Sequence, residues 1–192
     1  MNAPRLSILV LALGLALGGC SSVLTATREQ PIEDDRGTRT IGSRIDDSLI
    51  ETKASVNIAK AHPDLDTGSH VVVVSFNGVV LLAGQTPRSE LKTQAGQVAA
   101  SIQGVKRVHN ELQILQPSSG LARSNDTWLT TRIKAQMLGD AAIPGSRIKV
   151  ITENGIVYLM GLVTRAEANH ATSTVQSVSG VQRIVKLFEY LD

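Results

Sequence analysis

Phe76-Asn77-Gly78-Val79-Val80-Leu81-Leu82-Ala83-Gly84 recurs later in the chain as Glu153-Asn154-Gly155-Ile156-Val157-Tyr158-Leu159-Met160-Gly161. In each copy an Asn-Gly pair lies between two runs of β-branched and large apolar residues. Both residues of the pair tolerate positive φ, which a type I′ turn requires at its two central positions. The stretch therefore predicts a tight β-hairpin, and its recurrence predicts that the hairpin occurs twice.

The repetition extends on both sides of the hairpin. Downstream, residues 102–108 match residues 178–184, and upstream Asp47-Ser48-Leu49-Ile50 matches Asp126-Thr127-Trp128-Leu129. The offsets between matched residues change little, so the chain contains two copies of one unit of about 70 residues. The segment Gln116-Pro117-Ser118-Ser119-Gly120 is rich in turn-forming residues and predicts the joint between them.

Each copy predicts the order helix, strand, strand, helix, strand. In the second copy Ser124-Asn125-Asp126 supplies capping side chains, and Leu129, Ile133 and Met137 then form one apolar helical stripe. The second helix of each copy has apolar residues at helical spacing, at Leu91, Ala95, Val98, Ala99 and Ile102 and at Ala168, Ala171, Val175 and Val178. Gly104 and Gly180 are expected to end these helices in the left-handed conformation, before final strands over residues 108–115 and 184–191.

The chain begins with a short apolar segment, residues 6–17, that follows Arg5 and precedes Gly18-Gly19-Cys20. About 20 apolar residues are needed to span a bilayer as a helix, so this segment is too short to do so and is typical of a signal-peptide core. Cys20 is the only cysteine, which excludes an intramolecular disulfide. The arrangement resembles the bacterial lipobox, which implies cleavage before Cys20 and acylation of this residue. The alternatives are an ordinary secretory signal with a chance cysteine, or a buried core cysteine in a cytosolic protein.

Composition limits the remaining possibilities. Without residues 1–19, which carry Arg5, 18 Lys and Arg face 17 Asp and Glu, so anion binding would require a local patch. Near-neutral charge, an export signal and 3% aromatic content argue against nucleic-acid binding. Residues 21–40 have little apolar surface to bury and read as a flexible tether.

The repeated unit resembles the BON domain. The resemblance lies in the pattern Asn-Gly-Val-Val-x-Leu-x-Gly, followed by a helix and then Gly-Val-x-x-Val. A lipobox followed by two such copies is similar to the division- and outer-membrane-stress-associated lipid-binding lipoprotein family. The resemblance implies an α/β (α+β) fold with two helices on a three-stranded mixed sheet in each copy, and membrane association rather than catalysis. In those lipoproteins an aspartate after the cysteine favours inner-membrane retention, so Ser21 implies the outer membrane, on its periplasmic face. The expected organisation is a signal peptide at 1–19, a tether at 20–42, BON domains at 43–115 and 124–192, and a linker at 116–123 between them.

The sequence has no recognisable catalytic motif. The four histidines, His62, His70, His109 and His170, have no metal-ligand spacing, and the mature chain has no Gly-x-Ser-x-Gly elbow or phosphate-binding glycine loop. The acidic pairs Asp34-Asp35 and Asp46-Asp47 are more typical of a solvated linker or a helix start than of a metal or acid-base site. We therefore expect no enzymatic activity, no catalytic residue, no metal and no cofactor.

The first helix of the second copy has an outward face of unusual composition. A rotation of about 100° per residue places Trp128, Thr131, Ala135 and Leu138 opposite the core stripe, with Arg132 and Lys134 on the two flanks. An indole between cations is typical of a helix that lies among lipid headgroups. The resemblance adds that the related lipoproteins bind anionic phospholipid through this helix. The alternative is that Trp128 packs on the first copy as an interface anchor.

In the first copy the corresponding positions are Leu49, Thr52, Val56 and Ala59, with Lys53 beside them. Asp46, Asp47 and Glu51 lie close by and would repel anionic lipid, so the sequence favours the second copy. Two functions remain: a lipoprotein that binds anionic phospholipid, such as phosphatidylglycerol or cardiolipin, and supports envelope integrity, or an adaptor that docks onto an outer-membrane assembly or a division protein complex.

Overall fold

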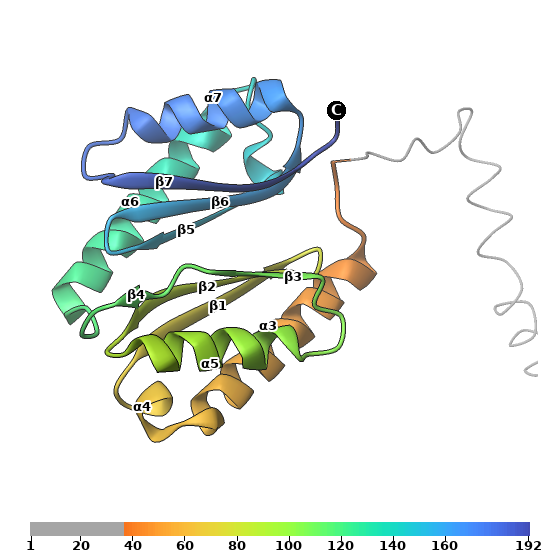
Figure 1. Ribbon diagram of the computed structural model, residues 1–192. Coiled ribbons are helices and arrows are strands. Elements are labelled where there is room, and N and C mark those ends of the chain that lie inside the picture. Colours follow the sequence, from red (N-terminus) through yellow and green to blue (C-terminus); the bar gives the residue numbers. More distant parts are fainter. Residues whose placement is uncertain (1–36) are drawn as a thin grey trace, which may run out of the picture. The chain divides into compact units, whose positions relative to one another are not determined.

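Both Asn-Gly pairs form the tight turn of a hairpin in the computed structural model, which describes residues 37–192 (Figure 1). The backbone φ is 54° at Asn77 and 79° at Gly78, and 51° at Asn154 and 72° at Gly155. Positive φ at both central residues matches the right-handed twist of the strands that the turn joins. The first turn joins β1 (His70–Phe76) to β2 (Val79–Thr86), and the second joins β5 (Ile148–Glu153) to β6 (Ile156–Val163).

Each hairpin gains a further parallel neighbour and becomes a mixed sheet. In the first copy β3 (Arg107–Asn110) and β4 (Gln113–Ile114) both pair with β2 in parallel, and in the second β7 (Arg183–Tyr190) pairs with β6. The long central strands β2 and β6 are almost wholly buried. This arrangement confirms the predicted mixed sheet in both copies.

Helices cover the outer face of each sheet (Figure 1). The first copy has α3 (Ile41–Ala61), the short α4 (Pro63–Asp66) and α5 (Ser89–Ala100), and the second has α6 (Gly120–Gly139), the 3₁₀ turn η1 (Gly145–Arg147) and α7 (Arg165–Gln176). Each copy encloses its own apolar core between helices and sheet. The predicted element order is thus confirmed; α4 and η1 are additions to it, and the last strand of the first copy is divided into β3 and β4.

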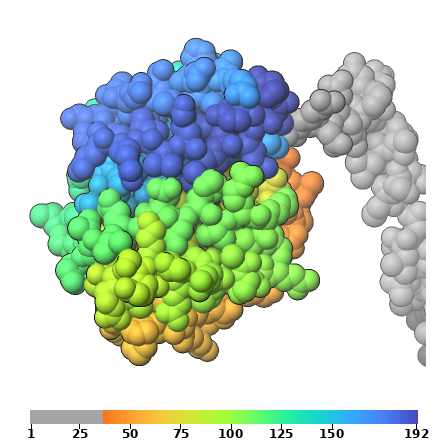
Figure 2. Space-filling model, viewed as in Figure 1, coloured from red at the N-terminus to blue at the C-terminus, as the bar shows by residue number. Residues whose placement is uncertain are grey.

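The inner faces of the two sheets form a third apolar cluster. Its buried members come from both copies: Val74, Phe76, Leu81, Ala83, Ile156, Tyr158 and Met160. The alternating strand pattern explains this, because Val80 and Leu82 point into the first core while Leu81 and Ala83 point to the other sheet. The two copies are therefore packed directly against each other, as Figure 2 shows for one face.

The final strand of the first copy differs from the expectation of one strand over residues 108–115. It breaks at Glu111 and Leu112 into β3 and β4, although the register to β2 is kept on both sides. Gly84 of β2 lies opposite the break with φ 107°, and a Cβ there would lie 2.0 Å from the carbonyl oxygen of His70. This kink in β2 interrupts the ladder. The corresponding Gly161 has no positive φ, and β7 runs unbroken.

Helix α6 begins earlier than Ser124-Asn125-Asp126, so the prediction of these residues as its caps was wrong. Ser119 is the N-cap, and its hydroxyl accepts a hydrogen bond from the N–H of Ala122 at 3.3 Å. The helix therefore extends through residues 120–123, part of the segment expected as linker. Asp126 lies in the second turn of the helix, where it is buried and has another role.

Gly104 and Gly180 do not terminate the second helices directly, which corrects a second expectation. Helix α5 ends at Ala100 and α7 at Gln176, and tighter i to i−3 hydrogen bonds such as Ile102 N–H to the Ala99 carbonyl at 3.3 Å continue beyond α5. Both glycines do adopt positive φ, 92° and 102°, in the loop that leads to the last strand. The left-handed conformation thus occurs at the predicted glycines, but each helix ends about one turn before its glycine.

Candidate membrane-contact surface

Helix α6 has one buried and one exposed face, as the sequence predicts. Leu129, Ile133 and Met137 are buried in the core of the second copy. On the opposite face Trp128 is 53% exposed and Leu138 is 67% exposed. The remaining predicted site residues, Thr131, Arg132, Lys134 and Ala135, are exposed as well. The structure thus brings all six predicted contact residues together on the surface of one helix.

Arg132 lies over the indole of Trp128. Its guanidinium carbon is 5.2 Å from the ring centroid, a cation–π contact that holds a flexible positive side chain beside an apolar one. Within residues 37–192, neither Arg132 nor Lys134 has an acidic side chain within ion-pair distance. Both positive charges therefore remain available to an external anion.

Leu121 belongs to the same exposed surface and was missed by the sequence reasoning. It lies seven residues before Trp128, two helical turns away on the same side, and is 82% exposed. It was missed because the helix was expected to begin after it. Ser119 before Gly120-Leu121-Ala122 was the available signal for the earlier start.

The interface between the copies does not include Trp128. The contact is made by the inner sheet faces, and polar pairs join its edges: Lys149 Nζ lies 2.7 Å from Glu51 Oε1, and Asn77 Nδ2 lies 3.1 Å from Glu189 Oε2. The alternative of Trp128 as an interface anchor therefore has no support in this arrangement. Its indole has solvent over half its surface.

Two buried aspartates fix the first helix of each copy to its hairpin. Asp47 accepts hydrogen bonds from the N–H groups of Asn77 (2.8 Å) and Gly78 (2.9 Å), and Asp126 accepts from Asn154 (2.8 Å) and Gly155 (2.9 Å). Asp47 is thus neither a free helix-start charge nor part of a metal site. The repeat could have revealed this role, because it aligns Asp47 with Asp126 and both turns with each other.

The charge on Asp47 is strongly stabilised. Burial alone would raise its pKa, but hydrogen bonds from the Gly78 N–H, the Ser75 hydroxyl, the Asn77 N–H and the Arg39 guanidinium lower the pKa below its usual value. The Arg39 Nη1 lies 2.6 Å from Asp47 Oδ2. The aspartate is therefore ionised and internally neutralised at neutral pH.

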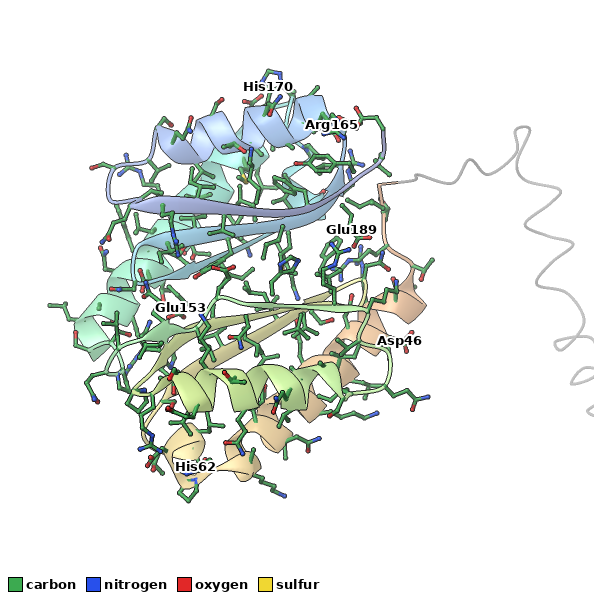
Figure 3. All side chains as sticks on the ribbon, in the orientation of Figure 1. Asp46, His62, Glu153, Arg165, His170 and Glu189 are labelled. Atoms are coloured by element: carbon green, nitrogen blue, oxygen red, sulfur yellow. The ribbon has the colours of Figure 1, made fainter. Side chains whose placement is uncertain are left out.

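Several other titratable groups of the described residues lie far apart from one another. His62 and His170 lie at opposite ends of the described part, near α4 and on α7, while Glu153 lies between the sheets (Figure 3). His70 Nε2 is 3.4 Å from Glu153 Oε1, and burial raises the pKa of Glu153. Burial likewise raises the pKa of Tyr158 to about 12, which keeps this phenol neutral between the sheets.

Residues 37–192 contain no group of three or more His, Cys, Asp and Glu placed to hold a metal ion. No helix among them combines the length and apolar character that a membrane crossing requires. Cys20, the predicted signal peptide and the predicted tether up to Arg36 lie outside the described residues.

Comparison with known proteins identifies the repeated unit. A model of the BON domain matches residues 46–116 and, again, residues 125–192. The chain belongs to the BON domain family. Both predicted copies are BON domains, each with the Asn-Gly hairpin at its centre.

The chain is also similar to curated proteins over most of its length. The chain is 36% identical over 194 residues to an outer membrane lipoprotein, DolP, of Haemophilus influenzae, covering 100% of each chain. It is 33% identical over 153 residues to a 21 kDa hemolysin of Actinobacillus pleuropneumoniae, with 80% of this chain and 78% of that one covered. It is 30% identical over 153 residues to the osmotically-inducible protein Y of Escherichia coli, with 78% and 75% covered. None of these relatives is named as an enzyme.

Proposed function

We propose that this protein is a non-enzymatic outer-membrane lipoprotein that binds anionic phospholipid through helix α6 of its second BON domain and supports envelope integrity. The full-length similarity to an outer membrane lipoprotein supports the location. The lipobox resemblance supports acylation at Cys20, which would place the folded part on the periplasmic face. Three acyl chains, at about 0.8 kcal/mol per buried methylene, hold a protein at a membrane almost permanently.

The exposed face of α6 is the observation that carries the lipid-binding proposal. It combines the half-exposed indole of Trp128 with exposed Leu121 and Leu138. Arg132 and Lys134 lie beside them, and neither has an acidic partner within ion-pair distance in the described residues. Indole prefers the boundary between headgroups and acyl chains, and each lysine or arginine near an anionic surface contributes about 1 kcal/mol. The surface therefore suits phosphatidylglycerol or cardiolipin better than a neutral lipid.

Tryptophan emission tests this proposal directly, because Trp128 is the only tryptophan. On mixing a Ser21–Asp192 fragment with vesicles rich in phosphatidylglycerol, we expect a blue shift that weakens as salt is added. Phosphatidylcholine vesicles are expected to produce a much smaller shift. The double variant Arg132→Gln/Lys134→Gln should lose most of the shift, and Lys186→Gln, an exposed lysine on β7, is the matched control.

An unchanged emission on anionic vesicles would contradict lipid binding by α6. The same exposed face would then be available to a protein, and the adaptor function would be favoured. Acyl labelling tests the anchor separately: Cys20→Ala should abolish incorporation of fatty acid. Labelling at an unchanged mature mass would contradict the lipobox interpretation.

A further inference from the structure

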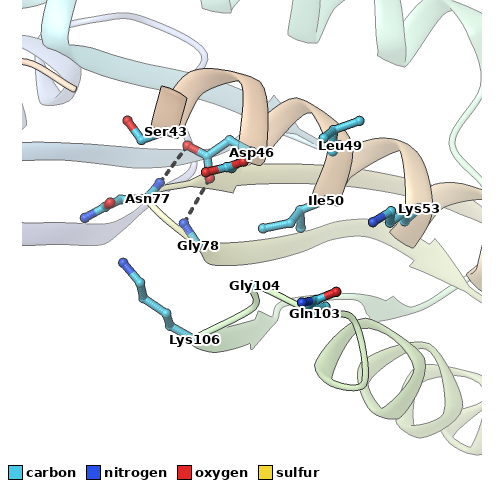
Figure 4. Close-up of a pocket in the computed structure, with 11 residues that line it drawn as sticks. Ser43, Asp46, Leu49, Ile50, Lys53, Asn77, Gly78, Gln103, Gly104 and Lys106 are labelled. Carbon is cyan, nitrogen blue, oxygen red and sulfur yellow. Dashed lines mark hydrogen bonds between the residues drawn. The ribbon is translucent and has the colours of Figure 1, made fainter. Parts of the chain in front are cut away.

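The first BON domain contains an open pocket of about 460 Å³ beside α3 (Figure 4). One wall is the first half of α3, a second is the Asn77-Gly78 turn, and the third is the loop through Gly104. Gly104 leaves the floor open, because a Cβ at this residue would lie 3.3 Å from the Ile50 side chain. The pocket is lined by Ser43, Asp46, Asp47, Leu49, Ile50, Lys53, Asn77, Gly78, Gln103, Gly104 and Lys106.

Two lysines contribute free positive charge to this pocket. Lys53 comes from α3 and Lys106 from the segment before β3, where its side chain packs over Gly78. Both are exposed, and neither has an acidic partner within ion-pair distance in residues 37–192. Figure 4 shows the two lysines at different ends of the pocket, so together they give it a local positive charge that attracts an anion.

The acidic residues nearby oppose an anion less than the sequence suggests. Asp47 is neutralised by Arg39 and by the N–H groups of the hairpin turn. Glu51 belongs to another side of α3, where it pairs with Lys149 of the second domain and accepts the Ser75 N–H. Of the three carboxylates, Asp46 alone has no ion-pair partner among residues 37–192. The sequence predicts that three carboxylates repel an anionic lipid here, but in the structure one of the three has no positive partner.

The outer side of α3 next to the pocket is apolar. Ile41, Ile45, Leu49 and Val56 are all exposed, with values from 45% to 78%. At about 100° per residue they fall within one quadrant of the helix, and Leu49 also lines the pocket. A cationic pocket beside an aliphatic stripe fits an amphiphile with a phosphate headgroup better than a free phosphate ion, which has no use for the stripe.

The second domain is built differently at the same positions. Trp128 replaces Leu49, Arg132 replaces Lys53 and Gln182 replaces Lys106 according to the repeat. Arg132 stacks on the indole, and the Gln182 side chain lies over Gly155, with its Nε2 2.8 Å from where a Cβ would be. The second domain thus presents a large aromatic surface where the first presents a pocket with two free lysines.

We propose that the pocket of the first BON domain is a second phospholipid site, which takes the headgroup of an anionic glycerophospholipid. Lys53 and Lys106 attract the phosphate from the two ends of the pocket, Asp46 accepts a hydrogen bond from a headgroup hydroxyl, and the glycerol and upper acyl carbons lie against Leu49. The net charge of these three side chains is +1, which complements a headgroup of charge −1 that carries hydroxyls. This site extends the proposed function, since it requires the same membrane but a different domain.

A fluorine label at the pocket tests the site independently of Trp128. The full-length lipoprotein carrying Gln103→Cys with a trifluoromethyl tag is placed in phosphatidylcholine nanodiscs with increasing phosphatidylglycerol. We expect the ¹⁹F resonance to shift as phosphatidylglycerol is added. Each lysine near an anionic lipid surface contributes about fivefold in affinity, so Lys53→Gln/Lys106→Gln should require about 30-fold more phosphatidylglycerol for the same shift. Lys60→Gln, on the same helix outside the pocket, is the control and should leave the titration unchanged.

Three results would overturn the second site. They are no ¹⁹F shift with phosphatidylglycerol, an equal shift with phosphatidylethanolamine or with inorganic phosphate added to phosphatidylcholine nanodiscs, and an equal loss in Lys60→Gln. Trp128 emission recorded on the same samples reports α6 separately. A ¹⁹F shift without a change in Trp128 emission would contradict lipid binding by α6 and leave the pocket site supported. An emission change without a ¹⁹F shift would contradict the pocket site and leave lipid binding by α6 supported.

Discussion

At the scale of single residues, Trp128 and Ile133 lie five positions apart on α6 but have different roles. Trp128 lies on the proposed membrane-contact face, and Ile133 belongs to the core of the second domain. Trp128 is 53% exposed, whereas Ile133 has no exposed surface. The two side chains have comparable apolar character, so their effects on substitution depend on burial rather than on residue type. Charge placed at each position distinguishes a surface residue from a core residue.

We predict that Trp128→Glu removes vesicle binding and leaves folding intact, since the new carboxylate remains in water. Ile133→Glu should unfold the second domain because an unpaired charge would be buried. Circular dichroism during thermal unfolding and vesicle sedimentation measure the two effects. Gln97→Glu, on the exposed side of α5, is the charge-matched control. Loss of folding in Trp128→Glu would show that the indole has a structural role.

The second prediction at this scale concerns Asp47, whose carboxylate accepts hydrogen bonds from the N–H groups of the first hairpin turn. Asp47→Asn should destabilise the protein by about 3 kcal/mol at neutral pH, because the amide loses the charge and turns a donor toward donors. The pKa of Asp47 is lower in the folded state than its ordinary 3.8, so its stabilisation is complete above that pH and is lost as the pH falls through the folded-state pKa. Urea unfolding from pH 7 to pH 2 should therefore show the difference between wild type and variant shrinking only below about pH 4. A difference that is constant over this range would exclude the charge as its source.

At the scale of elements, the kink of β2 at Gly84 is a structural difference between two otherwise similar sheets. A Cβ at Gly84 would lie 2.0 Å from a backbone oxygen of β1, and the φ of 107° is unfavourable for any residue with a side chain. The same kink splits the third strand into β3 and β4. This lets Leu112, between the two segments, lie fully buried in the first core.

We predict that Gly84→Ala destabilises the first domain by about 3 kcal/mol or more, through backbone strain and the clash with the His70 carbonyl. Gly139→Ala, at the last residue of α6, has no atom within 4 Å of the new Cβ and should be neutral within about 0.5 kcal/mol. Chemical denaturation of both variants measures the difference. Equal stability of the two variants would contradict the constrained geometry of β2.

At the scale of the whole described part, residues 37–192 contain three apolar clusters, and only the third is shared. The separate cores explain why the repeat is a unit of folding, while the shared cluster joins the inner faces of both sheets. Tyr158 and Met160 on β6 would be exposed in a second domain alone. A fragment designed to contain the second domain alone should include Ser119, because this residue is the N-cap of α6.

We predict that the protein unfolds in a single transition and that Met160→Asp divides this into two. The substitution places a charge between the sheets and leaves both separate cores unchanged, so each domain should unfold by itself at a lower temperature. Differential scanning calorimetry detects the division. Gln182→Asp, an exposed position near the second hairpin, should retain one transition. A single transition in Met160→Asp would mean that the shared cluster does not couple the domains.

The sequence by itself determined the duplicated unit, the hairpins, the mixed sheet and the two faces of α6. These features depend on local rules: Asn-Gly tolerates positive φ, and apolar side chains recur with the period of a helix or strand. The cap of α6 was misplaced because several adjacent residues, Ser119 and Ser124 to Asp126 among them, can cap a helix. Only tertiary contacts make Asp126 the acceptor for a turn 28 residues away.

Only the tertiary structure decided how charge is distributed around α3 and how the domains join. Asp47 and Glu51 count as two negative charges in the sequence, but Arg39 and Lys149 neutralise them from positions 8 residues before and 98 residues after, respectively. The continuous apolar runs of β2 and β6 predict two apolar faces for each sheet, because successive side chains point to opposite faces. They do not identify what packs against the inner face. That choice requires the packing of two sheets, because contacts between residues far apart in the chain leave no periodic signal in the sequence.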